Sequence, residues 1–153
     1  MTDPFETLIQ QLGVSLDVPL HVDRHRACTI RVHQQLNVQL QLDAASEKLW
    51  IASFICELPP GKFRENVLCE ALKSNNLPEP RVGTLGYISM NNRLTLHQAY
   101  RFASIEGDKL ANYLAGFIEY ANLWRETIER GQTSPAPIHG KASAKPFGLN
   151  RRP

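Results

Sequence analysis

The chain has 153 residues, 42% of them hydrophobic and 21% charged, which is the length and composition of one folded domain. It contains no apolar run of the roughly 18 residues that a membrane helix requires, and its acidic N-terminus lacks the order of a secretory signal. We therefore expect a cytosolic protein without stable membrane insertion. The net charge is +2, but removing the four bases of residues 131–153 from the 17 in the chain leaves 13 bases against 15 acids, a net charge of −2. A body without a concentrated basic face excludes the usual design of a nucleic-acid-binding domain, and we predict no nucleic-acid partner.

The first predicted element is a short helix that begins at Pro4. Asp3 is suited to the N-cap position, and Glu6 completes an arrangement like a capping box. Gly13 is expected to end the helix. The apolar residues at helical spacing are Phe5, Leu8, Ile9 and Leu12. A single apolar stripe of this kind must pack on another surface.

Three runs with the period of β-strands follow, at residues 28–32, 36–42 and 49–58. Apolar and polar side chains alternate in the first two, which indicates strands with one buried and one solvent-exposed face. The third run is apolar on both faces and includes Trp50 and Phe54. Such a strand is either central and covered twice, or it presents one apolar face to a partner.

A second helix is predicted over about residues 62–74, followed by strands at 85–90 and 93–100. The apolar stripe of this helix consists of Phe63, Val67, Leu68, Ala71 and Leu72. Asn91 and Asn92 separate the two strands, and both can take a positive φ, so we predict a two-residue hairpin turn.

The longest predicted element is a helix over residues 107–130, which has apolar residues at helical spacing along its whole length. Residues 131–153 change to a proline-rich composition without acids, and we interpret them as a basic, disordered tail after a folded domain of residues 1–130. The tail's bases are Lys141, Lys145, Arg151 and Arg152. The predicted order is α-β-β-β-α-β-β-α, an α+β fold with an antiparallel sheet covered by helices.

One group of residues has the composition of a metal site. His21, His25 and Cys28 are close in sequence, but their spacing matches no common closed site and no fourth ligand pair follows. We predict no metal and no cofactor. The alternative, a small enzyme or ligand-binding domain built on these three residues, predicts a bound metal or a deep polar pocket.

The candidate nucleophiles lack the surroundings that catalysis requires. Cys28, Cys56 and Cys69 are odd in number, widely spaced and set among apolar residues, so we expect reduced thiols that pack as small apolar groups. Ser53 and Ser89 lie within strands without the glycines of a nucleophile elbow. We predict that the protein is not an enzyme.

Apolar surface is in excess. Three helices and one sheet in about 130 residues have more apolar faces than one copy obviously covers. Either the remainder serves a second copy or an extended peptide, or all of it packs internally; periodicity alone leaves both open.

A series of short fragments occurs in a fixed order along residues 4–130. They are Phe5-x2-Leu8-Ile9-x2-Leu12-Gly13-Val14, Cys28-Thr29-Ile30, Val38-Gln39-Leu40, Leu49-Trp50-Ile51-Ala52, Leu58-Pro59-Pro60, Val67-Leu68-Cys69-Glu70-Ala71-Leu72, Gly83-Thr84-Leu85-Gly86-Tyr87 and Leu110-x3-Leu114-x2-Phe117-Ile118-x2-Ala121-x2-Trp124. In this order and spacing the sequence resembles the CesT-type (class I) type III secretion chaperones.

The resemblance implies a homodimer of this fold in the bacterial cytoplasm, without catalytic residues. Such a protein binds the extended N-terminal segment of one or more secreted effectors, keeps them competent for export and delivers them to the secretion ATPase. The residues that it implies for effector contact are Phe5, Leu8, Ile9, Leu12, Trp50 and Phe54. Those that it implies for the dimer interface are Val67, Leu68, Leu72, Leu85, Tyr87 and Met90.

Two questions stay open at this level. A protein of the same fold that sequesters a secretion or transcription regulator is the alternative to an effector chaperone. The basic tail is an addition to a family that is usually acidic, and it is either an inert solvated end or a contact for the ATPase, a membrane surface or an acidic partner.

Overall fold

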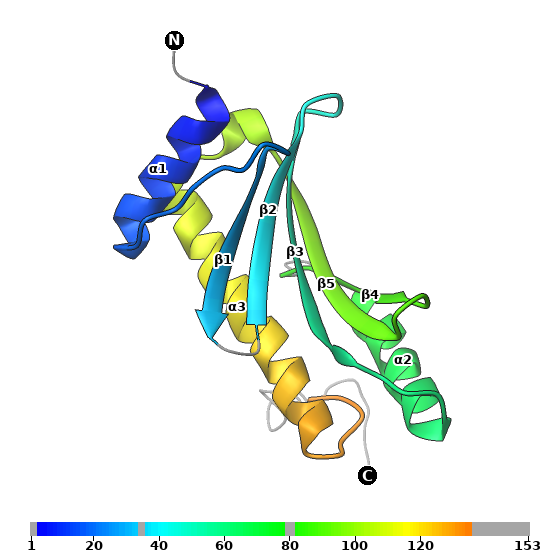
Figure 1. The fold of residues 1–153 in the computed structure, drawn as a ribbon. Helices are drawn as coiled ribbons and strands as arrows, with labels where there is room; N and C mark the ends of the chain where they lie inside the picture. The colour runs from blue at the N-terminus through cyan, green and yellow to red at the C-terminus, as the bar shows by residue number, and fades with distance from the viewer. Residues whose placement is uncertain (1–2, 34–35, 79–81, 136–153) are drawn as a thin grey trace.

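The computed structural model describes residues 3–33, 36–78 and 82–135. Its elements are α1 (Pro4–Leu16), β1 (Ala27–His33), β2 (Leu36–Asp43), β3 (Lys48–Glu57), α2 (Lys62–Asn75), β4 (Thr84–Ile88), β5 (Arg93–Arg101), a 3-10 turn (Phe102–Ser104) and α3 (Gly107–Glu129). The strands form one antiparallel sheet in the order β1-β2-β3-β5-β4 (Figure 1). The predicted element order and the α+β class are confirmed.

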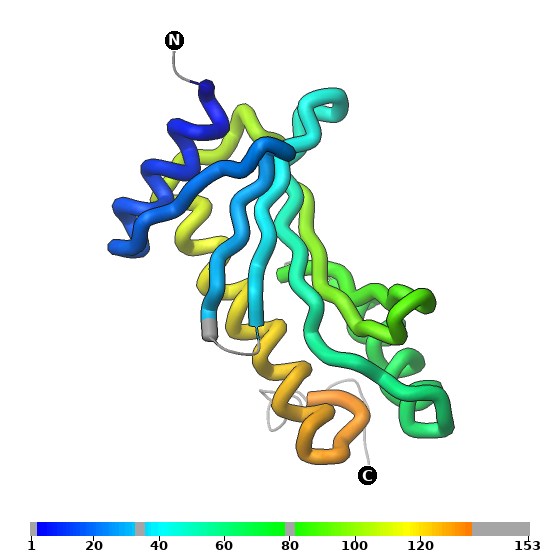
Figure 2. Tube along the Cα trace, viewed as in Figure 1, coloured from blue at the N-terminus to red at the C-terminus, as the bar shows by residue number. Residues whose placement is uncertain are grey.

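The helices gather on one face of the sheet. In Figures 1 and 2, α3 passes behind the strands, with α1 beside its N-terminal half and α2 next to β4 at the other end. The core between the layers includes Phe5, Ile9, Leu12, Leu40, Leu49, Ile51, Leu94, Leu96, Leu110, Phe117 and Trp124, all almost fully buried. The apolar stripes of α1 and α3 thus supply the helical side of one core, and alternate residues of the strands supply the other side.

A glycine allows α1 and α3 to approach closely. A Cβ atom at Gly107, the first residue of α3, would lie 2.5 Å from the Cβ of Gln11 in α1. Phe5 at the other end of α1 packs edge-on against Phe102, with ring centroids 6.4 Å apart. The N-terminus and the middle of α1 are therefore held against the start of α3 and the segment that leads into it.

The prediction that Gly13 ends the first helix is wrong. The helix continues to Leu16, and Asp17 adopts the left-handed conformation (φ 57°, ψ 42°) as the C-cap. Gly13 is instead a point of close approach, because a Cβ there would lie 2.8 Å from the carbonyl oxygen of Val18. The glycine lets the connector fold back over the helix rather than breaking the helix.

The predicted two-residue hairpin turn is also wrong. β4 ends at Ile88 and β5 begins at Arg93, so residues 89–92 form a four-residue turn. Only Asn92 of the Asn pair has a positive φ, at 57°. The side-chain amide oxygen of Asn92 accepts hydrogen bonds from the Tyr87 hydroxyl at 2.7 Å and from Arg64 of α2 at 3.0 Å. This network fixes the turn and ties α2 to it.

Residues 131–135 follow α3 without helix or strand. The remainder of the predicted tail, residues 136–153, lies outside the described residues, so the domain boundary at residue 130 stays a prediction. Within the described ranges no helix combines the length and the hydropathy needed to cross a bilayer.

Candidate functional site

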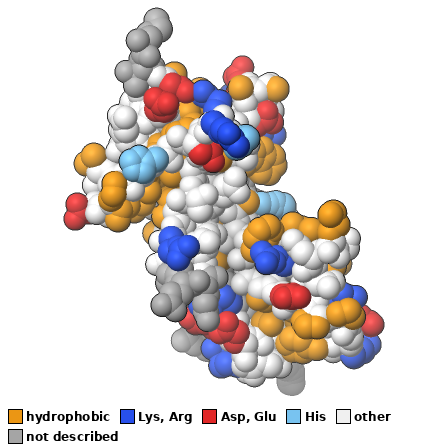
Figure 3. Space-filling model, viewed as in Figure 1, with side chains coloured by type: hydrophobic (Ala, Val, Ile, Leu, Met, Phe, Trp, Pro, Cys, Tyr) orange, Lys and Arg blue, Asp and Glu red, His pale blue; other side chains and the backbone are white. Residues whose placement is uncertain are grey.

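The sheet has a second face, opposite the helices, on which no helix of the described chain packs; we call it the open face. Strand pairing places these residues on it: Thr29, Arg31, Asn37, Gln39, Gln41, Trp50, Ala52, Phe54, Thr84, Gly86, Ile88, Arg93, Thr95, His97 and Ala99. Figure 3 views this face and shows uncharged surface interspersed with apolar groups and with separate basic and acidic side chains.

The structure shows whether β3, which is apolar on both faces, is covered on both of them or presents one to a partner. Leu49, Ile51 and Ile55 are buried against the helices, whereas Trp50 and Phe54 on the other side of the strand are 38% and 47% exposed. The two-residue alternation of a strand produces both sets. β3 is therefore a central strand covered once, and its second apolar face belongs to the open face.

Both exposed aromatic rings are held by neighbours from β5. The indole of Trp50 stacks on the imidazole of His97, with ring centroids 6.1 Å apart and an interplanar angle of 23°. The guanidinium of Arg93 lies 4.8 Å from the ring centroid of Phe54. These contacts fix the orientation of two large apolar side chains before any partner arrives, which reduces the entropy lost on binding.

A hollow of about 360 Å³ lies between these groups. It is lined by Thr29, Asn37, Gln39, Ala52, Ser53, Phe54, Ile88, Thr95 and His97. The Ser53 hydroxyl beneath it donates a 2.7 Å hydrogen bond to the Asn37 carbonyl, which links β3 to β2. Burial lowers the pKa of His97 below its usual 6.5, so the hollow has a neutral imidazole at neutral pH. Apolar walls with a few amide and hydroxyl groups suit a large apolar side chain that carries or adjoins a polar group.

The structure divides the residues predicted for effector contact. Trp50 and Phe54 lie on the open face, as described above. The four residues of the first helix are at most 4% exposed: Phe5, Leu8, Ile9 and Leu12. Their assignment to effector contact has to be corrected, because these side chains form the α1 part of the protein's own core.

The residues predicted for the dimer interface are also divided. Val67 and Leu85 are buried, and Leu68 and Tyr87 are partly buried. Leu72 and Met90 are 66% and 94% exposed, although Met90 lies in the turn after β4 and not in the strand. Further exposed apolar residues of α2 and the segments beside it are Phe63, Leu77 and Val82. The α2–β4 region thus presents a second apolar surface, separate from the aromatic centre of the open face.

The outer edge of β4 is closed by a side chain. The Asn75 amide donates to the Leu85 carbonyl and accepts from the Leu85 N–H, both at 2.8 Å. This pair of bonds imitates the pairing of a neighbouring strand. The opposite edge of the sheet, β1, has β2 as its strand partner within the described residues. Asp23 already binds both backbone groups of Ala27 at the start of β1, so an added strand would pair with the later part of β1 rather than with the middle of β4.

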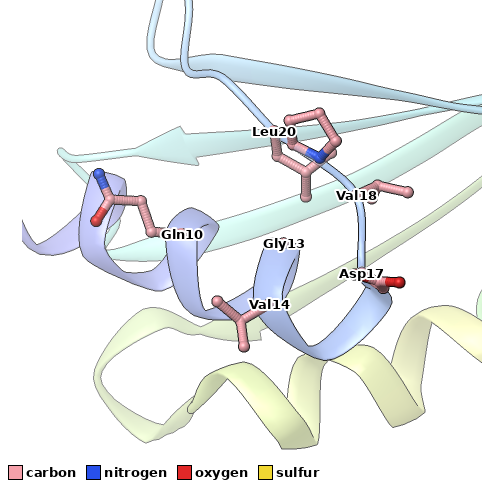
Figure 4. Close-up of a pocket in the computed structure, with 7 residues that line it drawn as sticks. Gln10, Gly13, Val14, Asp17, Val18 and Leu20 are labelled. Carbon is pink, nitrogen blue, oxygen red and sulfur yellow. The ribbon is translucent and has the colours of Figure 1, made fainter.

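A hollow of about 440 Å³ at the end of α1 is the main competitor for a binding site. Figure 4 shows Gln10 and Val14 on the helix and Val18 and Leu20 on the connector. Leu20 points toward the helix, whereas Val14 points away from the connector, and Val14 is 82% exposed. The side chains do not converge on a common point, so we take the open face as the candidate site.

The described residues that could bind a metal ion or act as nucleophiles are not arranged for either role. Within residues 3–33, 36–78 and 82–135, no group of three His, Cys, Asp or Glu side chains is placed to hold a metal ion. Burial raises the pKa of the Cys28 thiol, and it raises the pKa of Cys56 to about 11. Both thiols are therefore protonated and poor nucleophiles at neutral pH.

Sequence reasoning missed the contribution of β5 to the open face. Arg93, Thr95 and His97 alternate with the core residues Leu94 and Leu96. The same alternation is present in the sequence, so these three residues could have been assigned to the face opposite the core. Their pairing with β3, however, depends on a strand order that the sequence does not contain.

The arrangement of three helices on one face of a five-stranded antiparallel sheet is similar to that of solved type III secretion chaperones. Aligned over 82% of this chain and 99% of the other, a chain from the HopA1-SchA chaperone–effector complex has a TM-score of 0.65 and 22% identity. The Yersinia pestis type III secretion chaperone SycH, solved with a stable fragment of YscM2, has a TM-score of 0.60 and 14% identity, and the alignment covers 76% of this chain and 96% of the other. A chain from the ExoT-SpcS complex from Pseudomonas aeruginosa has a TM-score of 0.59 and 16% identity, with 79% of this chain and 97% of the other covered.

A comparison of the sequence with protein-family models shows the family of this chain. The model of the Tir chaperone protein (CesT) family matches residues 7–125, and the chain belongs to this family. The comparison with curated proteins finds no match. The resemblance noted along residues 4–130 is confirmed.

Proposed function

We propose that the protein is a type III secretion chaperone that binds the extended N-terminal segment of one or more secreted effectors on the open face and keeps them competent for export. The observation that carries this proposal is the uncovered central strand, with Trp50 and Phe54 exposed and held by His97 and Arg93. Membership of a chaperone family supports it, as does the similarity of the fold to chains from chaperone–effector complexes.

The open face offers two kinds of contact to an extended segment. The hollow of about 360 Å³ accepts one or two large apolar side chains. The free edge of β1 supplies main-chain donors and acceptors, so a strand of the cargo can extend the sheet. Main-chain bonds provide affinity for any extended chain, and the hollow selects the residues that flank them.

The exposed part of the α2–β4 surface, with Leu72 and Met90, is the proposed interface of a homodimer. Large apolar side chains with this exposure are costly in water and are relieved when two copies pair. The aromatic centre of the open face does not belong to this surface. Both copies can therefore bind cargo in the dimer.

The remaining parts of the proposal follow from the family. A chaperone of this kind acts by binding and needs neither a catalytic residue nor a cofactor. It acts in the bacterial cytoplasm, where the cargo is synthesised, and passes the cargo to the secretion ATPase. A secretion or transcription regulator as the cargo is the second possibility, and the identity of the bound partner distinguishes the two.

Co-expression with the proteins of a type III secretion system, followed by affinity purification and mass spectrometry, tests the proposal. The full-length chain should recover one or several secreted proteins, with contacts confined to their N-terminal segments. Phe54→Asp should lose them while keeping its circular dichroism spectrum. Val14→Asp, an equally polar change at an exposed residue of α1, should retain them. Recovery of the same partners by wild type and Phe54→Asp would contradict the open-face site.

A further inference from the structure

The open face carries more positive than negative charge, although residues 1–130 have a net charge of −2. Strand pairing places the following charged residues on or at the rim of this face: the bases Arg31, Lys48, Arg93 and Arg101, and the acids Asp43 and Glu57. The rest of the folded body must be correspondingly acidic. Charge is thus separated between the open face and the remainder of the fold.

Three of these bases have no carboxylate partner. Among the described residues, no Asp or Glu oxygen lies within 4.0 Å of the guanidinium of Arg31, Arg93 or Arg101. Glu57 pairs with Arg93 in the strand register but does not reach it. The Asp43 carboxylate is engaged by its own turn, where it accepts hydrogen bonds from Ala45 N–H and the Ser46 hydroxyl. The positive charge of the face is therefore not neutralised from within the described chain.

Arg93 stands directly beside the apolar hollow. Its guanidinium lies over the ring of Phe54, which forms a wall of the hollow. Arg31 is on β1, the edge strand to which an added cargo strand would pair, two residues from Thr29 at the rim of the hollow. An apolar side chain seated in the hollow would thus have a base on either side along the face.

We infer that the open face selects cargo segments in which a large apolar residue is flanked by acidic residues, with Arg31 and Arg93 as the specificity-determining bases. This inference rests on the proposed function, since it assigns a chemical class to the cargo of that site. A carboxylate beside the anchor residue forms a charge-assisted hydrogen bond with an arginine that has no other acidic partner. A lysine in the same place meets like charge, which is unfavourable when the two are juxtaposed.

A single-stranded nucleic acid is also anionic, but the geometry favours a peptide. His97 covers one face of Trp50 and Arg93 one face of Phe54, so each ring keeps one face for a partner, and stacking alone does not distinguish a base from a peptide side chain. The free edge of β1 matches the backbone of an extended peptide and has no counterpart in a nucleic acid. We therefore assign the face to a peptide and use an oligonucleotide as a competing probe.

Selection from a random peptide library tests the inference. Displayed peptides of about 12 residues, which extend about 40 Å and so cross the sheet, are selected on the immobilised full-length protein. Parallel selections use Phe54→Asp, the double variant R31E/R93E and the matched control Lys109→Glu. Lys109 lies on α3, so this control changes charge away from the open face. All four proteins keep the C-terminal bases, so subtracting the Phe54→Asp selection removes peptides that bind elsewhere.

The expected result is enrichment, on wild type and Lys109→Glu, of peptides with Asp or Glu beside a large apolar residue. The double variant should enrich Lys and Arg instead, and should bind the wild-type peptides about tenfold or more weakly. Peptides that are enriched on wild type relative to the Phe54→Asp variant, but that have no excess of Asp and Glu, would overturn the inference and leave the proposed function standing. The same holds if the peptides selected on R31E/R93E have the same composition as those selected on wild type. If no peptide is enriched over Phe54→Asp, the peptide-binding site itself is refuted. Tighter binding of a single-stranded oligonucleotide that competes with the peptides would also overturn the inference.

Discussion

The indole ring of Trp50 and the imidazole ring of His97 stack at the centre of the uncovered sheet face, with ring centroids 6.1 Å apart. The two residues come from β3 and β5, which are adjacent in the sheet but separated by α2 and β4 in the sequence. The contact has a consequence for pH, because burial at this place lowers the pKa of His97.

The stability of the protein should decrease in mild acid through His97. In the unfolded chain this imidazole accepts a proton near its usual pKa of 6.5, whereas the folded protein resists protonation until a lower pH. The free energy of unfolding therefore falls as the pH drops below about 6.5. Thermal melts at about pH 7 and about pH 5 should show a smaller decrease for His97→Gln than for wild type. Equal slopes for His97→Gln and wild type would contradict the prediction.

The α2–β4 surface should determine the oligomeric state. Leu72→Asp and Met90→Asp place a charge on side chains that are 66% and 94% exposed, so each monomer should still fold. Light scattering coupled to size exclusion should show a dimer for wild type and a monomer for either variant, with unchanged circular dichroism. Val14→Asp, at the far end of the molecule, should remain dimeric. A wild-type monomer at micromolar concentration would refute this interface.

Two helical glycines should respond to alanine in opposite directions. Gly13→Ala brings a Cβ to 2.8 Å from the Val18 carbonyl oxygen, so the connector must shift, which should cost about 1–3 kcal/mol of unfolding free energy. A Cβ added at Gly116 in α3 would meet no atom within 4 Å, and Gly116→Ala should stabilise the protein by up to about 1 kcal/mol. Urea unfolding followed by circular dichroism measures both. A Gly13→Ala protein as stable as wild type would show that the connector yields easily.

The three thiols should differ in reactivity. Cys28 is buried and Cys56 partly buried, with raised pKa values, whereas Cys69 on α2 is exposed. An aromatic disulfide reagent at about pH 8 should react rapidly with one thiol in the native protein and with all three after denaturation. Cys69→Ser should remove the rapid phase. Rapid reaction of the two remaining thiols in the Cys69→Ser protein would be incompatible with their burial.

The local pattern of the sequence was sufficient for the element order. The alternation in residues 36–42 and the helical spacing around Leu110 and Trp124 each specify one element and one buried face, and the structure has both. The turn at residues 89–92 was misjudged because two Asn residues permit a tight turn without requiring it. Here the side chain of Asn92 is bound by Tyr87 and by Arg64, and Arg64 belongs to α2, which is distant from the turn in sequence.

The candidate site was predictable only in part. An apolar stripe indicates that a face is covered but not by what, so the stripe with Phe5 and Leu8 could be assigned to a partner although it belongs to the protein's own core. The sequence left two possibilities for β3, because both of its faces are apolar, and only the family resemblance assigned Trp50 and Phe54 to a partner. The role of Arg93 depends on its position over Phe54, which follows from the register of β3 with β5.

The side-chain amide of Asn75, bonded to both backbone groups of Leu85, has a consequence for the behaviour of the protein at high concentration. A sheet with two unpaired edge strands and an apolar surface exposed to solvent can associate edge to edge with further copies of itself and grow into fibres. Asn75 occupies the outward backbone groups of Leu85 in the middle of β4, so pairing of a further strand there would first have to break these two bonds. The cap therefore disfavours growth through both edges of the sheet while the open face stays accessible.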